Sequence, residues 1–165
     1  MEQIKISEIQ PDKNQPRELF NQERLKEIAE SFKTTGIINP IEIDEDNKII
    51  TGECRWRAAK IAGIQTVPCI RKTGLSEEER LIRQLSENLA RQSLTVPEQI
   101  KGIERLIKIT AQSCAVSQNV GGRNHEGGVR KIARQLGVSE SWIRDLLKIK
   151  DAPSIVKKAV EDYKN

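Results

Sequence analysis

Residues 49–58 read Ile-Ile-Thr-Gly-Glu-Cys-Arg-Trp-Arg-Ala, and this stretch predicts three elements in succession. The two isoleucines end a strand, Gly52 permits a tight turn, and a helix begins at Glu53. We expect the helix to end near Ala62, because the glycine at position 63 favours termination. A strand, a glycine turn and a helix in this order are typical of an α/β unit.

The residues on either side extend this unit into a small sheet. Pairs of isoleucines within residues 41–50 flank the polar turn 44–48, which predicts a β-hairpin. Residues 67–70 (Val-Pro-Cys-Ile) predict the next strand, and alternating isoleucines in residues 3–9 predict an edge strand.

The most regular helical pattern of the N-terminal half follows Asn21, which suits an N-cap. Gly36 suits the C-cap. The apolar positions between them fall on one helical face: Leu25, Ile28, Ala29 and Phe32. Residues 11–16 contain two prolines and predict an extended loop before this helix.

Beyond residue 74 the pattern is entirely helical. Ser76 with Glu79, and Thr95 with Glu98, match the capping box that opens a helix.

Residues 115–128 contain four glycines and no periodicity, so we expect a long mobile loop there. Helical patterns resume at 129–136 and 139–149, and a short helix is expected after Pro153. The chain is therefore predicted to be an α+β protein, with a mixed α/β domain over 1–93 and an all-helical domain over 94–165.

Composition excludes several classes of protein. No apolar run approaches the roughly 20 residues that cross a bilayer, and the N-terminus lacks the pattern of a signal peptide. The cysteines, Cys54, Cys69 and Cys114, are odd in number and form no Cys-x-x-Cys pair. With His125 as the single histidine, these residues argue against a zinc site and favour a reducing cytoplasm.

The net charge of +4 is unevenly distributed along the chain. Residues 1–93 carry 15 basic and 16 acidic side chains, whereas residues 94–165 carry 13 and 8. A local basic surplus indicates a polyanionic partner such as nucleic acid, with an ordinary solvated surface as the alternative.

Residues 52–57 combine the features of an anion-binding site. Gly52 lets a ligand approach the backbone, and the N–H groups of the following helix carry the positive end of its dipole. Arg55 and Arg57 add forked donors that suit phosphate oxygens. A plain strand-to-helix turn with solvated arginines is the alternative.

A second pattern, Glu87-Asn88-Leu89-Ala90-Arg91, supplies a carboxylate and an amide oxygen of the kind that bind Mg²⁺ beside phosphates. The alternative is an ordinary helix C-terminus with a favourably placed arginine.

Residues 129–146 have the spacing of a helix-turn-helix. Ala133 is small where two helices would cross, Gly137 suits the turn, and Ile143 would anchor the second helix. Ser139 caps that helix, while Trp142 is expected to pack or to contact a phosphate backbone. The positions expected to bind DNA are Arg130, Ser139, Glu140, Ser141, Arg144 and Lys148, and Asp145 is a further position that could face a major groove. A plain helical hairpin is the alternative.

Five motifs in this order resemble the ParB family of chromosome and plasmid partition proteins, over residues from about 4 to 160. They are Asn14-Gln15-Pro16-Arg17, Gly36-Ile37-Ile38-Asn39-Pro40-Ile41, Gly52-Glu53-Cys54-Arg55-Trp56-Arg57-Ala58, Glu87-Asn88-Leu89-Ala90-Arg91 and Pro97-Glu98.

The resemblance implies an N-terminal domain of the ParB/sulfiredoxin fold that binds CTP and Mg²⁺, followed by a helical domain that binds double-stranded DNA. It implies nucleotide contacts from Gln15, Arg17, Gly52, Glu53, Arg55, Asn88 and Arg91. It also implies Mg²⁺ ligands at Glu87 and Asn88, and it assigns no catalytic residue.

The same resemblance implies a cytoplasmic, nucleoid-associated homodimer that closes through its N-terminal domain as a clamp on DNA. A ParA-type ATPase is the further partner that it implies, and any CTP hydrolysis would be slow.

Two departures from the family pattern bear on nucleotide affinity. Cys54 stands where the family usually has the first arginine of a pair, and Gln92 stands where an acidic residue often follows. Losing one phosphate-binding cation would cost about 1.5–3 kcal/mol of binding free energy. The chain also ends near Asn165, without the C-terminal dimerisation domain that the resemblance implies, so we expect it to be either a fragment or a short relative. Cys54 and the absent C-terminal domain favour the alternative hypothesis, a DNA-binding transcriptional regulator with a degenerate nucleotide site.

A third class is an enzyme. Sulfiredoxins share this fold and carry a Gly-Cys-His-Arg motif, of which this chain retains Cys54 before Arg55 but not the histidine. Free-serine kinases also share the fold and use a glutamate at a place that Glu18 occupies only loosely.

Overall fold

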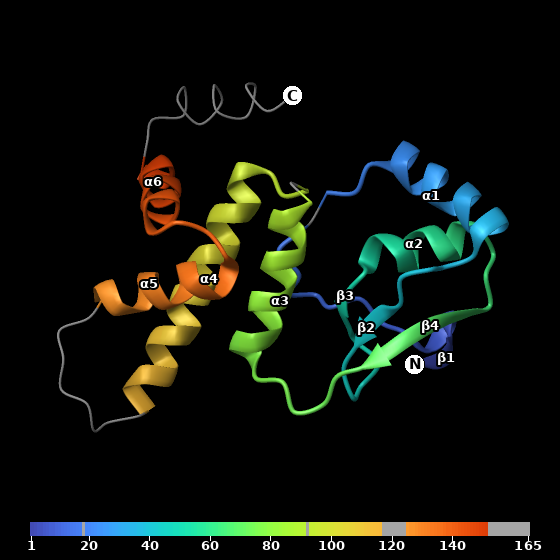
Figure 1. Ribbon diagram of the computed structural model, residues 1–165, viewed down its shortest axis with the longest axis horizontal. Helices are drawn as coiled ribbons and strands as arrows, with labels where there is room; N and C mark the ends of the chain where they lie inside the picture. The colour runs from blue at the N-terminus through green and yellow to red at the C-terminus, as the bar shows by residue number, and fades with distance from the viewer. Residues whose placement is uncertain (18, 92, 117–124, 152–165) are drawn as a thin grey trace. The chain divides into compact units, whose positions relative to one another are not determined.

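The computed structural model describes residues 1–17, 19–91, 93–116 and 125–151, with only the backbone at 113–116, 125–127 and 151 (Figure 1). The chain forms two compact units, Met1–Ser76 and a second unit that begins at Glu77. Each has its own hydrophobic core.

The first unit is built on a four-stranded sheet in the order β1-β4-β2-β3. Its strands are β1 (Glu2–Lys5), β2 (Ile41–Ile43), β3 (Ile49–Thr51) and β4 (Thr66–Arg71). β4 runs parallel to β2, and the two outer pairs are antiparallel. The predicted hairpin and the predicted strand at 67–70 are confirmed, which makes this a mixed α+β fold.

The edge strand is shorter than the alternating pattern in residues 3–9 predicts. A 3₁₀ turn, η1 (Ile6–Glu8), follows β1 directly. The turn redirects the chain, so that Ile9 is buried and Gln10 forms a parallel bridge with Lys48 beside β3.

Two helices of this unit, α1 (Gln22–Thr35) and α2 (Glu53–Ile61), match the sequence prediction and pack side by side (Figure 1). The Asn21 side chain caps α1 by accepting hydrogen bonds from the N–H groups of Glu23 and Arg24, at 2.9 and 3.1 Å. The buried core is formed by Ile4, Ile9, Ile41, Ile43, Ile49, Trp56, Ala59, Val67 and Cys69.

The described part of the second unit is helical and consists of α3 (Glu77–Ala90), α4 (Val96–Val116), α5 (His125–Leu136) and α6 (Glu140–Asp151). The second predicted capping box is present, because the Glu98 carboxylate accepts hydrogen bonds from the N–H and hydroxyl groups of Thr95, both at 2.8 Å. No helix in the described residues is both long and apolar enough to cross a membrane.

The prediction of a loop over 115–128 is wrong at both ends. Residues 115 and 116 belong to α4, and residues 125–128 belong to α5. Two of the glycines lie in the first turn of α5, where the N–H groups have no intrahelical acceptor in any sequence, so glycine weakens the helix less there. Residues 117–124 and the helix expected after Pro153 lie outside the described residues.

The boundary between the units precedes the predicted one after residue 93. The reason is that Leu81 and Leu85 of α3 are buried in the core of the second unit. That core contains Leu81, Leu85, Leu94, Val96, Ile103, Leu106, Ile132, Ala133, Leu136, Ile143 and Leu146.

The contact between α3 and α4 generates a stability prediction. A Cβ at Gly102 would lie 2.5 Å from Cδ2 of the fully buried Leu85. Overpacking of this kind costs about 1–3 kcal/mol, against a gain of roughly 1 kcal/mol in helix propensity. We expect Gly102→Ala to lower the free energy of unfolding measured in urea.

Gly128→Ala is the matched control, because no described atom lies within 4 Å of a Cβ at that helical position. Because Gly128 lies in the first turn of α5, this variant should raise the free energy of unfolding by less than about 1 kcal/mol. Effects of the same sign in the two variants would contradict the predicted contact with Leu85.

Cys69 generates a second prediction, because burial in β4 and the nearby Glu2 carboxylate raise the pKa of its thiol to about 11, against an opposing effect of Arg71. The unperturbed thiol has a pKa of 9.0. Between these two pH values the thiolate forms only in the unfolded chain, so stability present below pH 9 is lost as the pH rises to about 11.

The expected loss is about 2–3 kcal/mol in the free energy of unfolding. Urea unfolding of the wild type and of Cys69→Ala, repeated from pH 8 to pH 11, isolates this effect. A difference between the two proteins that does not change with pH would refute it.

Candidate functional site

The turn between β3 and α2 has the features expected of an anion site. Gly52 adopts a left-handed conformation with φ 101° and ψ 23°, which side chains rarely adopt. No side chain caps α2, and its first intrahelical hydrogen bond runs from the Trp56 N–H to the Gly52 carbonyl, at 3.1 Å. The first turn of α2 therefore presents backbone donors and the positive end of the helix dipole.

Arg55 has a contact that the sequence does not predict. Its Nη1 donates to the carbonyl oxygens of Asn39, at 2.9 Å, and of Pro40. The guanidinium also lies against Gly52, since a Cβ there would be 3.0 Å from both Cζ and Nη2. Arg55 thus braces the loop before β2 against the start of α2.

Glu53, another predicted nucleotide ligand, is nearly buried at 7% exposure. Its Oε1 accepts hydrogen bonds from Nε and Nη2 of Arg57, at 3.0 and 2.7 Å. The Arg57 guanidinium lies over the Phe20 ring, 3.9 Å from its centroid. Glu53 therefore holds Arg57 in place.

Arg17, in the loop before α1, contacts both Cys54 and the Phe20 ring. Its Nη1 lies 3.2 Å from Cys54 Sγ, and its Nε donates to the Leu19 carbonyl at 3.0 Å. The guanidinium is 5.0 Å from the Phe20 centroid, so both Arg17 and Arg57 contact this ring. Sequence reasoning missed Phe20, whose only signal was its place as the single aromatic residue between the proline-containing loop and α1.

Gln15 carries a donor without a partner. Its Nε2 is buried and makes no hydrogen bond to any described residue. A buried amide left in this state is costly, which makes Gln15 a ready donor to a bound polar group.

A cavity of about 400 Å³ opens beside this site, within the first unit. Trp56 and Leu25 give it apolar walls, and Arg57 and Lys60 give it positive charge, with Lys60 Nζ 4.4 Å from the Trp56 ring. Its lining is Pro11, Gln22, Leu25, Trp56, Arg57, Lys60 and Ile61.

The remaining predicted nucleotide and metal ligands lie on or just after α3, in the second unit. Arg91 pairs with Glu87 at 3.2 Å. Asn88 is buried, donates from Nδ2 to the Gln84 carbonyl at 2.7 Å and accepts at Oδ1 from the Ser93 hydroxyl at 2.9 Å. Asn88 therefore ties the last turn of α3 to the residues that follow it.

The side-chain oxygens of Glu87 and Asn88 suit Mg²⁺ only together with further ligands. That ion typically binds one or two carboxylates together with water and phosphate oxygens. Within the described residues, no group of three His, Cys, Asp or Glu side chains is placed to hold a metal.

Helices α5 and α6 are joined by a short turn. Gly137 has φ 70°, and the Ser139 hydroxyl accepts a hydrogen bond from the Trp142 N–H at 3.1 Å. Ala133 and Ile143 are buried, and Trp142 packs against the core. These positions have the burial and backbone conformation that the spacing predicts.

The outer face of this helix pair is polar. Among the residues singled out from the sequence, Arg130, Ser139, Ser141, Arg144, Asp145 and Lys148 are exposed, and Glu140 is half-buried. Glu140 pairs with Arg130 at 2.9 Å and with Arg144 at 3.4 Å, while Asp145 pairs with Lys148 at 3.0 Å.

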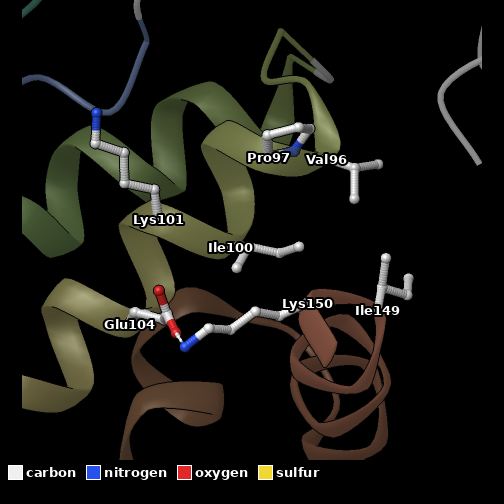
Figure 2. A pocket seen from close by; sticks show the side chains of 7 residues that line it. All are labelled: Val96, Pro97, Ile100, Lys101, Glu104, Ile149 and Lys150. Carbon is white, nitrogen blue, oxygen red and sulfur yellow. Dashed lines mark hydrogen bonds and ion pairs between the residues drawn. The ribbon is translucent and has the colours of Figure 1, made fainter. Parts of the chain in front are cut away.

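Figure 2 shows a second cavity, of about 290 Å³, between α4 and α6. Its walls are mostly apolar, and Glu104 and Lys150 form an ion pair at its edge. The lining residues are Val96, Pro97, Ile100, Lys101, Glu104, Ile149 and Lys150, none of which is a predicted site residue.

The chain matches the family model of the ParB N-terminal domain over residues 1–89. It is 35% identical over 159 residues to a probable chromosome-partitioning protein ParB of Rickettsia conorii. The matched region covers 96% of this chain and 50% of the relative. The chain thus spans about half the length of the curated relatives it matches.

Two solved structures of the Caulobacter crescentus protein are also similar. Its C-terminally truncated ParB bound to the centromeric parS site is 26% identical with a TM-score of 0.65, covering 96% of this chain and 76% of that one. The complex of the truncated protein with CTP-γ-S is 25% identical with a TM-score of 0.52, covering 96% and 83%.

The close approach of Arg55 to Gly52 generates a prediction. Gly52→Ala should displace the Arg55 guanidinium as well as strain the backbone, whereas Gly63→Ala should only strain it, since its φ is 72° and nothing lies within 4 Å. Both variants should lose about 1–2 kcal/mol of stability in urea. Calorimetric titration with tripolyphosphate should show binding weakened roughly tenfold or more by Gly52→Ala alone.

If the two variants bind tripolyphosphate equally well, the start of α2 is not the anion site.

Proposed function

This chain belongs to the ParB N-terminal domain family, and we propose that it binds CTP at the start of α2 and double-stranded DNA through α5 and α6, as a partition protein. The start of α2 carries the proposal. An uncapped helix N-terminus, the left-handed Gly52 and the guanidinium groups of Arg17, Arg55 and Arg57 are the chemistry that phosphate binding needs.

We propose that Gln15, Arg17, Gly52, Glu53 and Arg55 of the first unit contribute to nucleotide binding. The unpartnered amide of Gln15 supports this assignment, and the CTP-γ-S complex of the Caulobacter protein supports CTP as the nucleotide. Asn88 and Arg91 of the second unit are the further proposed contacts. Mg²⁺ held by Glu87 and Asn88 would neutralise phosphate charge.

Cys54 does not leave the start of α2 short of a cation. Nη1 of Arg17 lies 3.2 Å from Cys54 Sγ. The Arg17 guanidinium therefore supplies a positive charge beside Cys54, where the family usually has an arginine. This contact favours retained nucleotide binding over a degenerate site.

For DNA, we propose a helix-turn-helix with α6 in the major groove. The exposed cations of its outer face and the basic surplus of residues 94–165 support this assignment, as does the parS complex of the Caulobacter protein. The proposed DNA contacts are Arg130, Ser139, Ser141, Arg144 and Lys148, and Glu140 lies among them on the same face.

CTP would act as a switch in this proposal. A nucleotide shifts a two-state equilibrium only by its differential affinity for the two states, so hydrolysis need only be slow. The two states proposed are an open form and a homodimeric clamp closed on DNA through the first unit, with a ParA-type ATPase as the further partner.

Cys54 is the one observation that favours a second candidate, a DNA-binding regulator without nucleotide. The other departure, Gln92, and the kinase-like position, Glu18, lie outside the described residues.

The test is calorimetric titration of the chain with CTP, ATP and GTP in Mg²⁺, with and without a parS duplex. Selective binding of CTP is expected. Arg55→Ala should weaken CTP binding by tenfold or more and leave DNA binding intact, because a lost charge-assisted contact is worth about 1.5–3 kcal/mol. Arg144→Ala should have the opposite pattern.

Urea unfolding of both variants controls for loss of fold. If each variant loses both activities while remaining folded, the assignment to two separate sites is wrong. DNA binding without binding of any nucleotide would support the regulator.

A further inference from the structure

Glu140 joins two arginines of the proposed DNA-binding face. It is the first residue of α6, and its Oε1 lies 2.9 Å from Arg130 Nε on α5. Its Oε2 lies 3.4 Å from Arg144 Nη2, one turn further along α6. One carboxylate therefore uses both oxygens to hold two guanidinium groups from two helices.

We propose that Glu140 is a positioning residue that fixes Arg130 and Arg144 for DNA recognition and does not itself read a base. The inference rests on the proposed function, since it assumes that this face binds DNA. It assigns to Glu140 a role different from the direct contact that its position in the sequence suggests.

The burial of the three side chains supports this role. The Arg130 and Arg144 side chains are 71% and 52% exposed, whereas Glu140 is 31% exposed. The carboxylate thus lies beneath the two cations that reach into solvent. Surface ion pairs of this exposure add little to stability, so fold stability alone does not account for the arrangement.

Orientation is what such a carboxylate can supply. An arginine recognises a base edge or a phosphate through a planar fork whose direction decides whether both bonds form. A long side chain that is already held loses less conformational freedom on binding. Glu140 can therefore favour the sequence that the arginines match over other DNA.

The alternative is a bystander carboxylate, and the two readings predict effects of opposite sign. Any acidic side chain on this face repels phosphates, so removing a bystander charge should strengthen binding to all DNA. Removing a positioning residue should weaken binding to the matched sequence.

Asp145 provides the control within the same helix. It is 67% exposed and contacts one lysine, Lys148, whose side chain is 77% exposed. Asp145→Asn removes the same charge as Glu140→Gln without releasing an arginine.

The experiment uses two duplexes, one that the wild-type chain selects from a randomised library and a scrambled duplex of the same composition. Affinities of the full chain for both are measured over a range of salt concentrations. Glu140→Gln should lower the ratio of selected to scrambled affinity by roughly tenfold. Asp145→Asn should raise both affinities and leave their ratio unchanged.

A double-mutant comparison of Glu140→Gln with Arg144→Ala distinguishes a positioning role from a general structural effect. In an Arg144→Ala background, most of the loss caused by Glu140→Gln should disappear, whereas a folding defect would persist. Glu140→Gln overturns the inference if it raises affinity for both duplexes as Asp145→Asn does, or if its effect is unchanged without Arg144. A wild-type chain that selects no sequence overturns the proposed DNA recognition itself.

Discussion

At Gly52 the chain leaves β3 and enters α2 with φ 101°, a conformation that strains any residue with a Cβ. Much of the first unit depends on this turn. The missing side chain leaves room for the Arg55 guanidinium, which reaches the carbonyl groups of Asn39 and Pro40 in front of β2. Gly52 has no side chain to cap α2, so the N–H groups of the first turn have no intrahelical acceptor.

The loop before α1 is fastened to this turn by charge and by an aromatic ring. Arg17 reaches Cys54, and the Phe20 ring contacts both Arg17 and Arg57. Glu53 holds Arg57 from beneath with two hydrogen bonds to one carboxylate oxygen. The position of the loop before α1 therefore depends on the position of the side chains at the start of α2.

A similar principle applies to α5 and α6, where acidic residues lie among the cations of the face. Glu140 reaches two arginines and is less exposed than either, while Asp145 reaches one lysine and is largely exposed. The two carboxylates carry the same charge but differ in their burial and in the number of cations that they contact. Burial and the number of partners, more than charge, distinguish a positioning group from a solvated one.

The sequence by itself determined the local structure. Asn21, Thr95 with Glu98, and Ser139 form the caps predicted for them, and Gly52 lies at the predicted turn. These features depend on residues within a few positions of one another, so a linear pattern is enough to identify them. The motifs shared with the ParB family were recognisable for the same reason.

Only the tertiary structure decided which distant residues meet. It placed β4 between β1 and β2, and it assigned α3 to the second unit because Leu81 and Leu85 are buried there. It also brought Arg55 to the Asn39 carbonyl, and both Arg17 and Arg57 to Phe20. Such contacts depend on packing between segments that are far apart in the chain, and no local preference for helix, strand or turn encodes them.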